Sequence, residues 1–121
     1  MGSAGPLTGR SILLVEDEPI IALDIAQGFR AAGAVVFIAS NLIDGIRLAD
    51  HPDLSAAVLD FGLSDGHGTA LCERLNQRGI PFLLHTGYPH VKGACSSAMI
   101  VPKPAAPSQL VSAIEGLIKA G

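Results

Sequence analysis

Polar side chains in this 121-residue chain lie where apolar runs of strand length end. They comprise three carboxylates, a hydroxyl and an amine: Glu16, Asp17, Asp60, Thr86 and Lys103. If the runs form neighbouring parallel strands, their carboxyl ends share one edge of the sheet and these groups converge in one pocket. Carboxylate oxygens bind hard divalent cations, and an amine binds phosphoryl oxygens. The pattern therefore predicts a site that binds a divalent cation and a phosphoryl group together.

The apolar pattern also contains the elements that would position such a site. Apolar runs alternate with segments whose apolar residues recur at helical spacing, which predicts βαβ units around a parallel sheet. We expect a doubly wound α/β fold with five strands: residues 11–15, 35–39, 56–60, 80–85 and 99–101.

Proline, glycine and capping residues indicate where the helices begin and end. Pro19 opens the first helix, in which Ile21, Ile25 and Phe29 recur every four residues on the face expected to cover the sheet. Residues 87–97 have little apolar periodicity, so we expect a short or mobile helix before the fifth strand. The other expected helices begin at Ser40 or Asn41, after the glycine-rich loop 61–68, and at about Ala106.

Composition favours one folded domain and argues against several classes of protein. Hydrophobic residues make up 49% of the chain and charged residues 16%, so disorder is expected only at the ends. The 8 lysines and arginines are scattered and the net charge is −3, which argues against direct nucleic-acid binding. The longest small-to-apolar stretch, residues 31–39, is about half of the roughly 18 residues that a membrane span needs.

The first ten residues lack the basic and apolar regions of a secretory signal. We therefore expect residues 1–10 to be a flexible segment, residues 11–121 to form the domain, and the protein to be cytoplasmic. Cys72 and Cys95 have no C-x-x-C or zinc spacing, which favours two reduced thiols. The four histidines share no metal spacing and are interpreted as structural or exposed: His51, His67, His85 and His90.

Taken in order, the acidic pair, the aspartate, the threonine and the Lys-Pro dipeptide form a more specific pattern than any of them alone. This order resembles the receiver domain of two-component response regulators, over about residues 11–120. The resemblance implies a flavodoxin-like (βα)5 fold and a signalling module, not an enzyme. It implies that Glu16 and Asp17 hold Mg²⁺ or Mn²⁺, Asp60 accepts phosphate, Thr86 is the switch hydroxyl, and Lys103 binds phosphate. The Lys103–Pro104 bond is usually cis in this family.

The resemblance further implies a route for the phosphoryl group. Asp60 would take it from a phosphohistidine of a sensor histidine kinase or a histidine phosphotransfer protein, and the phosphorylated form would bind a downstream protein. The metal ion would be held by Asp17, Asp60 and the Gly62 carbonyl, with Glu16 acting through water. Because no DNA-binding segment follows in this sequence, we expect a stand-alone receiver.

Two departures from the family pattern concern the switch. Ile100 occupies the position three residues before the lysine where receivers usually have an aromatic residue. Tyr88 lies two residues after Thr86, as in the receiver subgroup called FAT GUY, and is our candidate for the moving aromatic side chain. Thr86 and Lys103 are separated by 103 − 86 = 17 positions, which is short for a receiver and suggests a reduced fourth helix.

Other functions remain open at this point. A degenerate receiver would act only as a protein-binding module, without phosphorylation. A Mg²⁺-dependent phosphatase of the dehalogenase type needs a second aspartate two positions after the nucleophile, where this chain has Gly62. A flavodoxin-like cofactor binder is disfavoured because no Gly-rich phosphate loop follows the first strand.

Overall fold

The computed structural model describes residues 5–60, 66–87, 93–96 and 98–120. Five parallel strands form one sheet, as the sequence predicts, and their order in it is β2-β1-β3-β4-β5. The strands are β1 (Ser11–Glu16), β2 (Val35–Ala39), β3 (Leu54–Asp60), β4 (Phe82–Thr86) and β5 (Met99–Pro102). The helical elements are α1 (Pro19–Ala31), α2 (Leu42–Leu48), α3 (Gly66–Gln77), the 3₁₀ turn η1 (Gly93–Cys95) and α4 (Pro107–Ala120).

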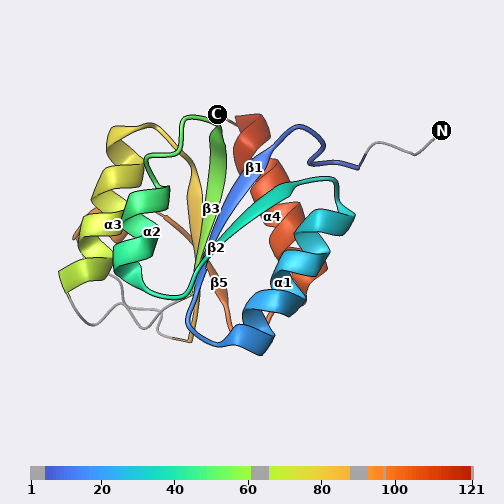
Figure 1. The fold of residues 1–121 in the computed structure, drawn as a ribbon, viewed down its shortest axis with the longest axis horizontal. Helices are drawn as coiled ribbons and strands as arrows, with labels where there is room; N and C mark the ends of the chain where they lie inside the picture. Colours follow the sequence, from blue (N-terminus) through green and yellow to red (C-terminus); the bar gives the residue numbers. More distant parts are fainter. Residues whose placement is uncertain (1–4, 61–65, 88–92, 97, 121) are drawn as a thin grey trace.

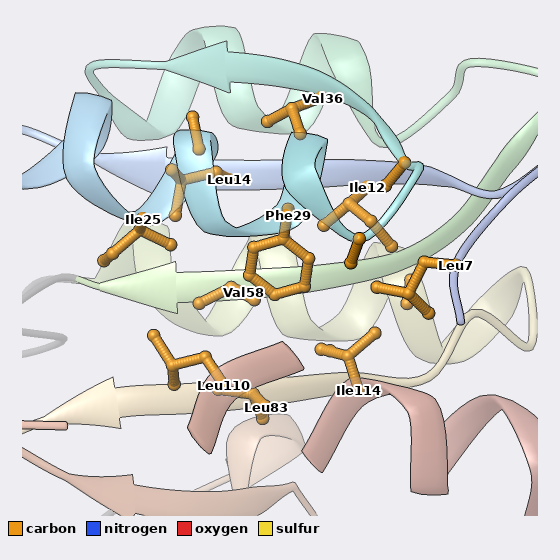
Figure 2. Close-up of a cluster of buried hydrophobic side chains, with 14 of the residues drawn as sticks. Leu7, Ile12, Leu14, Ile25, Phe29, Val36, Val58, Leu83, Leu110 and Ile114 are labelled. Atoms are coloured by element: carbon orange, nitrogen blue, oxygen red, sulfur yellow. The ribbon is translucent and has the colours of Figure 1, made fainter. Parts of the chain in front are cut away.

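Helices cover both faces of the sheet, as Figure 1 shows, with α1 and α4 on one face and α2 and α3 on the other. The α1/α4 face holds one buried apolar cluster, in which Phe29 of α1 and Leu110 of α4 lie over Leu14 and Val58 of the central strands (Figure 2). Strand side chains alternate between the two faces, so β1 and β3 are buried on both sides. The central strands are therefore held rigidly up to their carboxyl ends.

Local sequence accounts for the ends of the helices. Asn41 caps α2, because its side-chain oxygen accepts a hydrogen bond of 2.9 Å from the Asp44 N–H. Gly33 and Gly79 follow α1 and α3 with φ of 98° and 66°, a left-handed conformation that glycine adopts without a Cβ clash. The Ile80 N–H still donates to the Leu75 carbonyl, so β4 begins at Phe82 and not at Ile80 as predicted.

Two sequence-based expectations at the start of the chain were wrong in detail. Ile21 is 40% exposed, because the four-residue repeat drifts from the 3.6-residue helical period and Ala22 faces the sheet in its place. The expected flexible segment 1–10 is packed in its described part, since Leu7 is 1% exposed and lies in the α1/α4 cluster. The Leu7 N–H also donates to the Ala32 carbonyl at 2.9 Å. The folded domain therefore extends a few residues upstream of the first strand.

The segment between β4 and β5 has only the three-residue turn η1 in its described part, in agreement with the predicted short fourth helix.

The expectation of two reduced thiols was wrong: Cys72 of α3 and Cys95 of η1 form a disulfide with a Cα–Cα distance of 5.2 Å. The fold packs η1 against α3 and so brings together two cysteines that are 23 positions apart in the sequence. Within the described ranges, no helix has the length and apolarity needed to cross a membrane.

Candidate phosphoryl-acceptor site

The register of the sheet places three polar side chains in one row at the carboxyl ends of the strands. Glu16 is paired with Asp60, and Leu59 is paired with Leu84, so that His85 is the neighbour of Asp60 on the next strand. Because side chains alternate along a strand, the residues two positions earlier lie on the same face. These residues belong to the α1/α4 cluster of Figure 2: Leu14, Val58 and Leu83. The row therefore lies on the α1/α4 face, at the edge where the sequence predicts the site.

Asp60 is at the centre of this row, and its side chain has no exposed surface. Its Oδ2 lies 3.1 Å from Nδ1 of His85, and its Oδ1 pairs with the amine of Lys103. Burial alone would raise the pKa of Asp60, but hydrogen bonds from His85, Lys103 and Glu16 outweigh burial and hold the pKa below its ordinary value of 3.8. Asp60 is therefore ionised at neutral pH, as an oxygen nucleophile must be.

Lys103 reaches this carboxylate from the turn that follows β5. The prolines on either side restrict its backbone, the Lys103–Pro104 bond is cis, and the Lys103 N–H donates to the Thr86 carbonyl at 3.1 Å. Burial alone would lower the pKa of the amine, but the hydrogen bond and charge of Asp60, with smaller effects from Glu16 and Asp17, raise it. The amine is therefore a permanent cation, and 39% of the side chain remains exposed.

Glu16 is the third member of the row and is 1% exposed. Among the described residues, no hydrogen-bond donor lies in bonding geometry to either oxygen of the Glu16 carboxylate. Burial first, and then the neighbouring Asp60, raise the pKa of Glu16 to about 8. In the metal-free protein the carboxyl group therefore retains its proton at neutral pH and shares it with Asp60.

Two adjacent buried carboxyl groups fit a hard divalent cation, because a cation supplies the positive charge that both oxygens lack. Mg²⁺ and Mn²⁺ both bind oxygen ligands of this kind. Asp17 is exposed beside the row, and the Gly62 carbonyl lies outside the described residues. Within the described ranges, no three His, Cys, Asp or Glu side chains form a complete metal cage. The buried ligands of a metal ion at this site would thus be the carboxylate oxygens of Glu16 and Asp60.

The raised pKa of Glu16 predicts a pH-dependent response to the metal. In the unfolded chain Glu16 ionises near its ordinary pKa of 4.5, whereas in the metal-free fold it ionises at about 8. The folded state therefore loses stability as pH rises from 4.5 to about 8, and Mg²⁺ should restore most of it by pairing with the ionised group. Thermal unfolding with EDTA and with Mg²⁺, from roughly pH 5 to pH 9, measures this effect.

Glu16→Gln is the matched control for this response, because it keeps the size of the side chain and does not ionise. We expect the thermal stability of Glu16→Gln not to fall with pH over this range. We also expect Mg²⁺ to stabilise this variant less than it stabilises the wild type. Equal pH profiles for the wild type and Glu16→Gln would contradict the assignment of the pKa of about 8 to Glu16.

The structure brings together most of the residues that the sequence singles out. Glu16, Asp60 and Lys103 interact directly, Asp17 acts on Lys103 through its charge, and Thr86 is buried at the end of β4 next to His85. The switch candidate Tyr88 lies outside the described residues. His85 was missed, although its position one residue before Thr86 on a predicted strand already placed it at the same edge of the sheet.

Comparisons with known proteins agree with this geometry. Residues 12–115 match the family model of the response regulator receiver domain. The chain is 28% identical over 112 residues to the acid tolerance regulatory protein ActR of Rhizobium meliloti, covering 87% of this chain and 58% of that protein. It is also 28% identical over 117 residues to the transcriptional regulatory protein CusR of Escherichia coli K12, covering 91% of this chain and 52% of that protein. The chain thus spans little more than half the length of these relatives.

Solved structures have the same fold. A CheY-like receiver domain protein from Methanospirillum hungatei is 25% identical with a TM-score of 0.79, over 92% of this chain and 94% of that one. A receiver protein from Sinorhizobium medicae is 22% identical with a TM-score of 0.80, over 93% and 96% of the two chains. The receiver domain of the sensor histidine kinase PA1611 from Pseudomonas aeruginosa, solved with magnesium in its active-site cleft, is 22% identical with a TM-score of 0.77, over 93% and 99%.

Proposed function

Because this chain belongs to the response regulator receiver domain family of two-component signalling, we propose that it accepts a phosphoryl group on Asp60 with the help of Mg²⁺ or Mn²⁺. The observation that carries the proposal is the environment of Asp60. Its carboxylate is fully buried yet ionised, it pairs with the Lys103 amine, and the second carboxyl group, of Glu16, lies beside it. A buried aspartate of purely structural use would not need a second buried carboxyl group beside it, because such a group ionises only at a cost in free energy.

The phosphoryl donor would be a phosphohistidine, on a sensor histidine kinase or a histidine phosphotransfer protein. An oxygen of Asp60 attacks phosphorus, the P–N bond breaks, and its electron pair returns to the imidazole of the donor. The product is an aspartyl phosphate. The donor is already activated, so the protein mainly needs to position the groups and offset the charge between carboxylate and phosphoryl oxygens.

A divalent ion held by the carboxylates of Glu16 and Asp60, with the charge of Asp17 nearby, would supply that charge compensation when present. Magnesium in the cleft of the PA1611 receiver supports the same choice of ion here. Lys103 provides the second positive charge and is exposed enough to turn from Asp60 toward a phosphoryl oxygen. Thr86 lies at the end of the neighbouring strand, where its hydroxyl can bond the new phosphoryl oxygens and draw in the loop that follows.

The proposal is tested by incubating the protein with acetyl phosphate and Mg²⁺, followed by intact-mass measurement. We expect a mass gain of one phosphoryl group, no gain when EDTA replaces the metal, and loss of the group in mild base, as for an acyl phosphate. The absence of any gain at saturating acetyl phosphate and metal would refute the proposal. It would favour a phosphorylation-independent receiver that acts as a binding module.

A further inference from the structure

We propose that His85 is a positioning residue for Asp60, which orients the carboxylate and speeds the loss of the phosphoryl group by donating a hydrogen bond to it. This inference rests on the proposed function and extends it to the lifetime of the phosphorylated state. It starts from the 3.1 Å contact between His85 Nδ1 and Asp60 Oδ2. None of the family features named above requires a histidine at this position.

Burial makes that contact the dominant polar interaction of the ring. His85 is only 4% exposed, on a strand whose other buried side chains facing the same cluster are apolar. A buried imidazole costs free energy unless its nitrogens have partners. Its Nε2 has no hydrogen-bond partner in the described part of the chain, so the contact to Asp60 is what favours histidine over leucine or valine here.

The direction of this hydrogen bond follows from its acceptor. The ionised carboxylate of Asp60 can only accept, so Nδ1 of His85 must carry the hydrogen. The neutral Nδ1–H tautomer and the imidazolium both supply that hydrogen. A donor to Asp60 is therefore present in both forms of the ring.

His85 and Lys103 contact different oxygens of the Asp60 carboxylate, and their side chains differ in mobility. Lys103 pairs with Oδ1 through a long side chain that is 39% exposed, so it can leave the carboxylate for a phosphoryl oxygen. His85 contacts Oδ2 from a side chain that is only 5% exposed, on the α1/α4 face of the sheet. In the aspartyl phosphate, His85 would remain as the donor to the carboxyl group after Lys103 has turned away.

This donor acts on the step that removes the phosphoryl group. When water attacks phosphorus, the bond between phosphorus and the Asp60 oxygen breaks, and its electron pair returns to the carboxylate. One proton of the water remains on the phosphate and the other passes to solvent. The negative charge spreads over both carboxylate oxygens, so the hydrogen bond from His85 strengthens as the bond breaks. Removing the donor should therefore slow hydrolysis.

The experiment follows the decay of the phosphoryl group after removal of excess acetyl phosphate, by intact mass, in the wild type and variants. We expect His85→Leu to lose the group about ten-fold more slowly, the size of effect that one charge-assisted hydrogen bond supports. His85→Asn keeps an N–H donor near the position of Nδ1 and should decay within about three-fold of the wild type. Thermal unfolding of each variant identifies any that fails to fold, and His85→Val then replaces His85→Leu.

Val101 provides a matched control, because it pairs with His85 on β5, packs against the same cluster and has no group that could donate a hydrogen bond to Asp60. Val101→Leu changes packing at this edge and should leave the decay rate unchanged. Decay of His85→Leu and His85→Val at the wild-type rate would overturn the inference, as would equal slowing in His85→Asn and His85→Leu. If the wild type takes up no phosphoryl group at all, the proposed function itself fails, which is a separate result.

Discussion

Asp60→Asn is expected to take up no phosphoryl group from acetyl phosphate or from a phosphohistidine donor, where the wild type gains one. The amide has the shape of the carboxylate but lacks the ionised oxygen that attacks phosphorus. Since the donors around Asp60 keep it ionised in spite of its burial, the effect on chemistry is total and not a shift in affinity. Intact-mass measurement with acetyl phosphate and Mg²⁺ checks this.

The fold should survive Asp60→Asn, because the amide keeps the size of the carboxylate and its carbonyl oxygen can still accept the hydrogen bond from His85. Asp53→Asn is the matched control: it makes the same chemical change at an exposed position before β3, and it should be phosphorylated as well as the wild type. A full mass gain in Asp60→Asn would mean that another side chain accepts the group. Peptide mapping of the modified protein would then identify that side chain.

Reduction of the Cys72–Cys95 disulfide is expected to lower the free energy of unfolding by about 3 kcal/mol, the typical effect of opening a loop of this length. The bond joins α3 to η1, in a stretch that has little other regular structure among the described residues. Without it, the unfolded chain gains conformational freedom and η1 loses its covalent attachment. Unfolding in urea with and without a reductant measures the difference.

The control for this prediction is the double variant Cys72→Ala with Cys95→Ala, whose stability should be insensitive to reductant. Both side chains are almost fully buried, so the double variant is also expected to be less stable than the oxidised wild type. If the reductant leaves the wild type unchanged, the disulfide does not contribute to stability in solution.

Much of the fold and the main site could be predicted before the structure was known. The alternation of apolar runs with helical periodicity is a local property of the chain, and it predicts a parallel sheet because βαβ units close in only one way. The carboxyl ends of such strands meet at one edge, so the positions of Asp60 and Lys103 at the ends of runs already implied that they meet. The ion pair between them confirms that inference.

Other features depended on how the elements pack. Whether Cys72 meets Cys95 depends on the placement of η1 against α3, and the 23-residue separation carries no signal for it. The exposure of Ile21 depends on which face of α1 packs on the sheet, and that face includes Ala22 and not Ile21.

The sequence by itself determined which polar residue stands at the end of each strand, because strand length, the period of the apolar residues and the residue after each run are local properties of the chain. Only the tertiary structure decided which side chain faces which across the sheet. The contact between His85 and Asp60 results from a register between two strands that are distant in sequence, and nothing local to either strand specifies a register. The same holds for the pKa of Glu16, which is set by burial and by a neighbour 44 positions away, 60 − 16.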